Sequence, residues 1–101
     1  MNVFPAILDA DSIRQLAAPG GAACRMLVSS FAAGLRVPEE GRSQHDEIEI
    51  SLVLSGAFDL ESGGERRRIE AGDAVVVPAG ESHFFHVLAD TRIFTVTVGG
   101  A

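Results

Sequence analysis

The sequence has one cysteine and no lysine. A single cysteine excludes an intramolecular disulfide, so we expect a protein of a reducing compartment. All eight basic residues are arginine, and the net charge of −6 argues against a nucleic-acid-binding surface, which normally needs a basic face. The one basic run, Arg66–Arg68, is flanked by Glu65 and Glu70, so we interpret it as a solvated strand face.

Long apolar runs are also missing. No stretch is long or apolar enough to span a bilayer, and the N-terminus lacks the basic start and apolar core of a signal peptide. These absences predict a cytoplasmic protein with no membrane partner. Arginine without lysine, together with abundant alanine and glycine, is associated with GC-rich bacterial genomes.

What is present fits one globular domain. A chain of 101 residues has no room for a second domain. Its hydrophobic content of 47% and charged content of 22% are typical of such domains. We expect a single domain over residues 1–101, with an N-terminal arm at 1–21 and a β-barrel at 22–98.

Short alternating segments separated by turn residues dominate the chain. Roughly eight short strands, with turns every 8–12 residues, predict an all-β sandwich or barrel. A brief helical turn capped by Asp11-Ser12 is expected over residues 13–17, and a loop over 34–42. Turns are expected at Ser55-Gly56 and Asp90. The clearest strands are residues 22–32, 46–54, 57–61, 65–70, 72–78, 82–89 and 92–98.

The segment Asp46–Leu54 has strict period-two alternation, which favours a strand over a helix. On a strand, His45 and Glu49 point to one face, which they share with Ser43. This face could be the solvated side of the sheet, with the aliphatic face as the core. Alternatively it faces a barrel interior, where a glutamate is costly unless it is paired or bound to a cation. The two faces carry Ile48, Ile50, Leu52 and Leu54 on one side, and Glu47, Glu49, Ser51 and Val53 on the other.

A second informative stretch is Gly72–His83. Its three valines, residues 75–77, favour a buried strand. Turn residues precede them, and Pro78-Ala79-Gly80 follows them. The arrangement directs His83 to a fixed point. Taken alone, it is equally compatible with an ordinary hairpin that carries a surface histidine.

The two stretches together resemble the cupin family. The tract His45-x3-Glu49-x6-Gly56 matches the second half of the first cupin motif, G-x5-H-x-H-x3-E-x6-G. The tract Gly72-x5-Pro78-x-Gly80-x2-His83 matches the second motif, G-x5-P-x-G-x2-H-x3-N, up to its histidine. The resemblance covers roughly residues 31–98 and implies a double-stranded β-helix, or jelly-roll barrel. Residues 45–56 also resemble the sensor domains of arabinose-type transcription regulators.

The resemblance implies a metal site made by His45, Glu49 and His83. Ser43 stands where the family has its first histidine ligand, so Ser43 and Glu47 are weak or water-mediated candidates. Two imidazoles and a carboxylate resemble the ligand set that holds divalent iron, and manganese, nickel or zinc would also accept it. The motif's leading glycine and closing asparagine are also replaced, by Val37 and Val87. The expected pocket lining is Ser51, Val53, Phe85 and Phe94.

If Glu49 faces inward, the aliphatic side of its strand faces outward and needs a cover. The N-terminal arm, with Val3, Phe4, Ile7 and Leu8, could supply it. A second subunit could do so instead, and we expect a homodimer through this surface, as is common among cupins.

Three functions are compatible with these features. The first is a metal-dependent cupin enzyme acting on a small oxygen-containing substrate. The second is a non-catalytic, sensor-like cupin that binds a small molecule with weak or no metal, which the missing histidine favours. The third is a structural dimeric module without a ligand. Catalytic residues are not assigned, since a fold does not fix a function.

Overall fold

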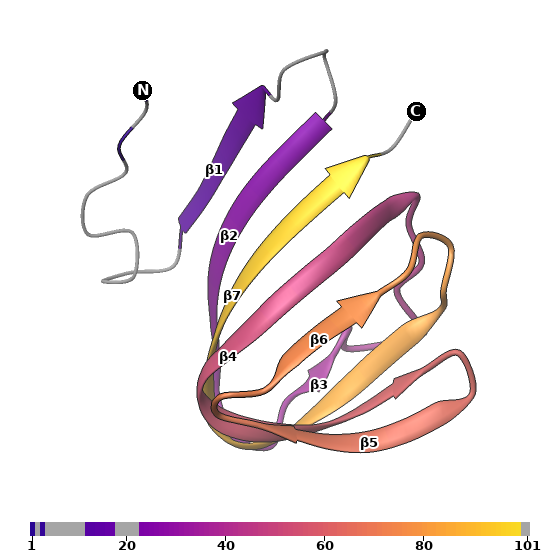
Figure 1. Ribbon diagram of the computed structural model, residues 1–101. Helices are drawn as coiled ribbons and strands as arrows, with labels where there is room; N and C mark the ends of the chain where they lie inside the picture. Colours follow the sequence, from indigo (N-terminus) through magenta and orange to yellow (C-terminus); the bar gives the residue numbers. More distant parts are fainter. Residues whose placement is uncertain (2, 4–11, 18–22, 100–101) are drawn as a thin grey trace.

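The structure is a computed structural model, and it describes residues 1, 3, 12–17 and 23–99. These residues form β-strands and no helix. Figure 1 shows the strands winding into an open barrel. In chain order they are β1 (Ser12–Ala17), β2 (Ala23–Phe31), β3 (Arg36–Val37), β4 (Glu47–Ser62), β5 (Glu65–Glu70), β6 (Ala74–Val77) and β7 (His83–Gly99).

The long strands β4 and β7 each contribute to two sheets (Figure 1). The first half of β4 pairs with the second half of β7, and β2, β1 and β6 extend this first sheet. The second half of β4 pairs with the first half of β7, and β5 and β3 extend this second sheet. All of these pairings are antiparallel, so the bends of β4 and β7 fold one continuous ladder into a jelly-roll.

The bend of β4 depends on Gly56. The register between β4 and β7 shifts at Val53, Ser55 and Ala57, which is a bulged region. Gly56 has φ +89°, and a Cβ there would lie 2.3 Å from the carbonyl oxygen of Asp90. The Thr91 hydroxyl, on a residue that is 2% exposed, accepts a hydrogen bond from the Ala57 N–H at 3.2 Å. Glycine is therefore required for both its conformation and the close approach of β7.

The core lies between the two sheets. Its buried residues come from β4, β5 and β7, and the half-buried Phe31 of β2 and Phe85 of β7 pack against them. Phe85 contacts Phe31 edge-on, at 5.3 Å between ring centroids, and Phe58 at 4.9 Å. The core set is Val53, Phe58, Leu60, Ile69 and Ile93.

The all-β jelly-roll prediction is confirmed, while several local predictions are wrong. The helical turn over 13–17 is strand β1, which pairs with β2 along its whole length, so sheet hydrogen bonding overrides local propensity. The turns predicted at Ser55-Gly56 and Asp90 lie inside β4 and β7, where the chain bends without leaving the ladder. The loop 34–42 contains the two-residue strand β3.

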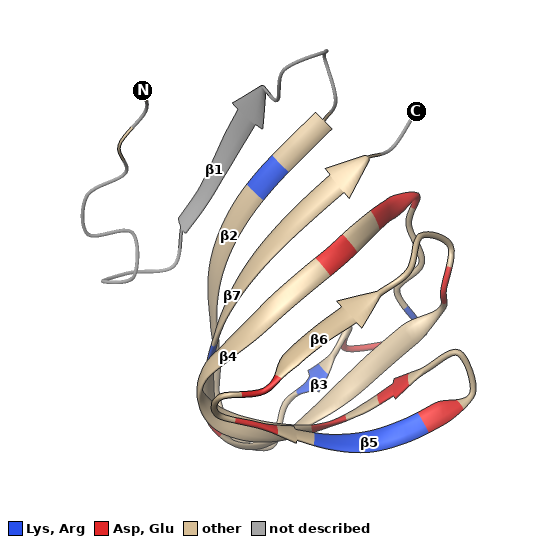
Figure 2. Ribbon diagram, viewed as in Figure 1, with Lys and Arg blue, Asp and Glu red and all other residues tan. Residues whose placement is uncertain are grey.

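Charged residues follow the expected pattern on β5. Arg66, Arg67 and Arg68 are exposed on this strand, seen as its blue stretch in Figure 2. Arg68 lies 3.8 Å from Glu70, a solvated contact. Among the described residues, the structure contains no helix long and apolar enough to cross a membrane.

Replacing Gly56 with alanine is expected to destabilise the barrel more than the same change at Gly64. Gly64 also has positive φ (+80°), but a Cβ there would meet nothing within 4 Å. Gly64→Ala should therefore lower the free energy of unfolding by about 1 kcal/mol through backbone conformation alone. Gly56→Ala should cost about 1–3 kcal/mol more, because β7 has to move. Equal losses of unfolding free energy for the two variants in urea denaturation would contradict the close approach of β7 to Gly56.

Candidate metal centre

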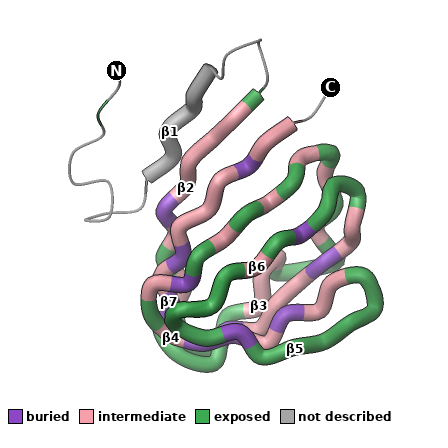
Figure 3. Tube along the Cα trace, in the orientation of Figure 1, coloured by how far each residue is buried: buried purple, intermediate pink, exposed green. Residues whose placement is uncertain are grey.

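The start of β4 and the residues before it place alternate side chains inside the barrel. From Ser43 to Ile50, half-buried and exposed positions alternate strictly. Figure 3 shows the same alternation along β4. His45 and Glu49 are on the half-buried side, with side chains 29% and 28% exposed. The polar face of this strand therefore faces the barrel interior, and the alternative that it is the solvated side is excluded.

The turn between β6 and β7 brings the third group into place. Gly80 has φ +77°, and its N–H donates to the His45 carbonyl at 2.8 Å. The Gln44 side-chain amide donates to the Gly80 carbonyl, also at 2.8 Å. The backbones of Ser43 and His83 then exchange two hydrogen bonds, of 2.8 and 2.9 Å. The two motifs recognised in the sequence are thus joined directly by backbone hydrogen bonds.

His45, Glu49 and His83 meet in one cluster. The Nε2 atom of His45 lies 3.0 Å from Oε1 of Glu49, and the Nε2 atom of His83 lies 3.6 Å from Oε2. One ligand atom from each of the three residues lies within 4.8 Å of the others. The imidazole rings are nearly perpendicular, at 81°, with centroids 5.3 Å apart. His83 is 6% exposed, so the cluster is deepest at this ring.

Backbone carbonyls determine which ring nitrogen of each histidine faces the carboxylate. Nδ1 of His45 lies 3.0 Å from the Glu47 carbonyl, and Nδ1 of His83 lies 2.9 Å from the Glu81 carbonyl. A carbonyl oxygen only accepts hydrogen bonds, so each Nδ1 carries a proton and donates it. In the neutral rings, both Nε2 lone pairs then point toward the Glu49 carboxylate. Such facing acceptors need a proton or a cation between them.

Glu47 faces the same side of β4 but has a different partner. Its carboxylate pairs with the Arg25 guanidinium of β2 at 2.5 Å. The pKa of Glu47 is held below its usual range, first by the neighbouring Thr97 hydroxyl and then by Arg25. The Thr97 hydroxyl lies outside regular hydrogen-bond geometry. Glu47 is therefore ionised and neutralised by Arg25, away from the cluster of His45, Glu49 and His83.

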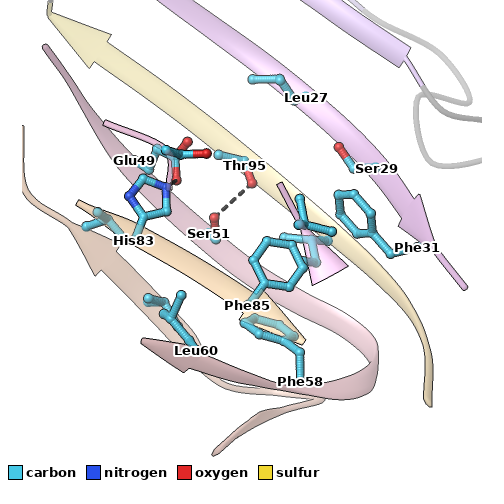
Figure 4. A pocket seen from close by; sticks show the side chains of 15 residues that line it. Leu27, Ser29, Phe31, Glu49, Ser51, Phe58, Leu60, His83, Phe85 and Thr95 are labelled. Carbon is cyan, nitrogen blue, oxygen red and sulfur yellow. Dashed lines mark hydrogen bonds and ion pairs between the residues drawn. The ribbon is translucent and has the colours of Figure 1, made fainter. Parts of the chain in front are cut away.

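Below the cluster lies a cavity of about 190 Å³ (Figure 4). Ser43, Glu49 and His83 line its polar end. Ser51 and Thr95 are joined across it by a hydrogen bond of 2.8 Å between their hydroxyls. The remaining lining is mostly apolar: Leu27, Ser29, Phe31, Val37, Phe58, Leu60, Val75, Val77, Phe85 and Ile93.

The expected pocket residues divide between cavity, core and outer surface. Ser51 and Phe85 line the cavity. Val53 points inward but lies in the core, where it is 1% exposed. Phe94 does not line the cavity, because it alternates with the inward-facing Ile93 and Thr95 and pairs with Leu52 on the outer face.

Sequence reasoning missed Thr95 and the part of the cavity wall that Leu27 and Ser29 of β2 form, although Phe31 of the same strand was expected to line the barrel or its core. The signal was present, since every second residue from His83 through Thr95 shares one face of β7. The predicted turn at Asp90 interrupted that count. His86, the third histidine, lies on the opposite face of β7, with its ring 5.7 Å from that of Phe84.

The cupin domain family profile matches residues 32–99 of this chain. The match covers more than half of the chain, so the chain belongs to the cupin family. An uncharacterised protein of Streptomyces coelicolor is 33% identical over 58 residues. That alignment covers 56% of this chain and 55% of the relative, so the chain matches about half of that protein's length.

Solved structures support the same fold. KdgF from a Halomonas species superposes with a TM-score of 0.66 and 24% identity, covering 100% of this chain and 86% of that one. A predicted oxalate decarboxylase from Thermotoga maritima gives a TM-score of 0.66 and 19% identity, covering 92% and 96%. At these identities the likeness concerns the cupin barrel and not the reaction.

Proposed function

We propose that this cupin binds one divalent metal ion through His45, Glu49 and His83 and uses it to hold a small oxygen-containing molecule in the barrel. The observation that carries the proposal is the orientation of the two imidazoles. Both donate from Nδ1 to a backbone carbonyl, and both direct Nε2 toward one carboxylate. Carbonyl partners of this kind fix the tautomer and ring orientation of metal-binding histidines.

The spacing of the ligand atoms fits a metal ion. Two ligands about 2.1 Å from an ion and at right angles lie about 3.0 Å apart. Here the Nε2 atom of His45 lies 3.0 Å from Oε1 of Glu49, and the Nε2 atom of His83 lies 3.6 Å from Oε2. Iron, manganese, nickel and zinc all accept two imidazoles and a carboxylate. A bound ion would supply a Lewis acid that polarises a coordinated oxygen.

The serine at position 43 affects whether the site is better suited to an enzyme or to a sensor. The family resemblance places a fourth protein ligand there, and this chain has a hydroxyl instead. One protein ligand fewer leaves more positions for a bound molecule, but it also weakens the hold on the ion. The clustering of His45, Glu49 and His83 supports metal-assisted catalysis as the first function, and the missing histidine at Ser43 favours reversible small-molecule sensing as the second. Turnover of a bound compound by the metal-loaded protein would distinguish them.

Removal of one ligand is expected to abolish stoichiometric metal binding. Wild-type protein, purified without chelator or affinity metal, should carry about one ion per chain. Glu49→Gln keeps the shape of the side chain but removes its charge, and should weaken binding at least about 100-fold. His83→Ala should do the same, whereas His86→Ala on the opposite face should bind like wild type. Metal analysis and titration with Co²⁺ provide the measurement.

Wild-type protein that takes up no metal after reconstitution, while circular dichroism shows it folded, would exclude the metal-binding function. Equal binding by wild type and Glu49→Gln would place any bound ion elsewhere.

Introducing the family's missing histidine is expected to tighten metal binding. Ser43 lines the cavity beside His83 and is held to it by two backbone hydrogen bonds. Ser43→His should therefore raise the affinity for Co²⁺ on the order of tenfold by adding a ligand. Ser29→His, which adds an imidazole at a different wall of the same cavity, is the control and should change it little. Unchanged affinity in Ser43→His would show that residue 43 does not face the ion.

We also propose that the chain forms a homodimer through the outer face of the first sheet. Ile48, Ile50 and Leu52 are 41–45% exposed, and Val76 of β6 is 61% exposed. Ile50 lies between Val96 and Val76 in the strand register, which makes an apolar row across the sheet. Exposed apolar patches of this kind mark interaction sites. Of the arm residues expected to cover this face, Val3 is 71% exposed, and Phe4, Ile7 and Leu8 lie outside the described residues.

A charge on this face is expected to separate the dimer. Ile50→Glu should shift sedimentation from dimer to monomer at micromolar concentration, because the buried carboxylate would be unpaired. Leu88→Glu is the matched control, since Leu88 is 44% exposed and Ile50 45%. Leu88 lies on β7 outside the first sheet's apolar row, so its substitution should leave the dimer intact. A monomeric wild type would rule out the proposal.

A further inference from the structure

The cavity below the metal-binding cluster has a polar end and an apolar end. Figure 4 shows Glu49 and His83 together at one end, and Phe31, Phe85 and Phe58 gathered at the other. The hydroxyls of Ser51 and Thr95 lie between them. A molecule that fills this cavity therefore has a polar head on the metal side and a hydrocarbon group among the aromatic rings.

The size of the cavity restricts the molecule. Its volume of about 190 Å³ is below the roughly 300–1,000 Å³ of typical ligand pockets. A small ligand therefore fits within it, whereas sugars with several rings, peptides and nucleotides would extend beyond it.

The charges around the cavity restrict the molecule further. Among the described residues that line the cavity, only Glu49 and His83 can ionise, and none is an arginine. The Arg25 guanidinium on the same side of β2 is already paired with Glu47. With neutral imidazoles, Glu49 and a divalent ion together carry one net positive charge. The cavity can thus neutralise a single negative charge, and a second carboxylate among the phenylalanines would be buried without a partner.

We infer that the ligand is a small, singly charged oxygen chelator with a compact hydrocarbon group, such as a 2-oxo or 2-hydroxy monocarboxylate with an aliphatic side chain. This inference rests on the proposed metal-binding function and adds the class of molecule that the site selects. The ligand's carboxylate and its adjacent oxygen would bind the metal ion at the coordination positions that His45, Glu49 and His83 leave free. One of these is free because Ser43 replaces a histidine. The hydrocarbon group packs against Phe58 and Phe85.

The test is a titration of Co²⁺-loaded protein with three acids, followed by the visible spectrum of the ion and by calorimetry. 2-Oxo-4-methylpentanoate should bind and perturb the cobalt spectrum. 2-Oxoglutarate has the same chelating group and a second carboxylate, and should bind at least about tenfold more weakly. 4-Methylpentanoate, which lacks the second oxygen, should also bind at least about tenfold more weakly and perturb the spectrum less.

A pair of variants at Leu27 tests the charge argument. Leu27 is half-buried and lines the cavity. In the strand register it lies opposite Thr95, whereas Glu49 lies opposite Thr97, two residues further along β7. Leu27→Arg adds a cation to the wall and should reduce the preference for 2-oxo-4-methylpentanoate over 2-oxoglutarate at least about threefold. Leu27→Gln, of similar length without the charge, should retain most of that preference.

The outcomes separate the two proposals. Stoichiometric cobalt binding with equal or tighter binding of 2-oxoglutarate in the wild type would overturn the inference about the ligand and leave the metal site standing. Cobalt binding with no response to any of the three acids would do the same. Failure to bind cobalt at all would overturn the metal site, and the inference about the ligand with it.

Discussion

The antiparallel pairing of β4 with β7 is the contact on which both the barrel and the site depend. Each strand crosses both sheets, and their register runs from Glu47 with Gly99 to Ser62 with His83. The residues of the cluster come from opposite ends of this ladder. Glu49 stands near the start of β4, while His83 begins β7, and the fold of the ladder at Gly56 and the backbone bridge of Ser43 with His83 bring them together. Gly56, which is not part of the cluster, is thus necessary for the arrangement of His45, Glu49 and His83.

The electrostatics of the cluster follow from hydrogen bonds made on its outer side. Each imidazole has one nitrogen that donates to a carbonyl, so in a neutral ring the other nitrogen is an acceptor. Two acceptors and a carboxylate directed at one point are unfavourable in a partly buried place unless a cation joins them. The Arg25 guanidinium is paired with Glu47. The cluster therefore needs a shared proton or a bound cation, and the proposed metal ion would supply the cation.

Much of the fold and the cluster could be predicted from the sequence, because both rest on period-two alternation and on motif spacing. The side chains of His45, Glu49 and His83 share the interior because their parity on β4 and β7 determines it. The bends were mistaken for turns, because Ser55-Gly56 and Asp90 have turn chemistry and no local signal shows that the ladder continues. That error placed Phe94 in the pocket and omitted Thr95. The pairing of Glu47 with Arg25 joins residues distant in the sequence, so no spacing rule could have found it.

A crystal structure of the Co²⁺-loaded protein tests most directly whether both imidazole rings face one metal ion. Anomalous scattering at the cobalt edge locates the ion independently of the protein atoms. We expect one anomalous peak bonded to Nε2 of His45, Nε2 of His83 and the carboxylate of Glu49, with both Nδ1 atoms still donating to their carbonyls. A peak at another place, or a ring bound through Nδ1, would contradict it.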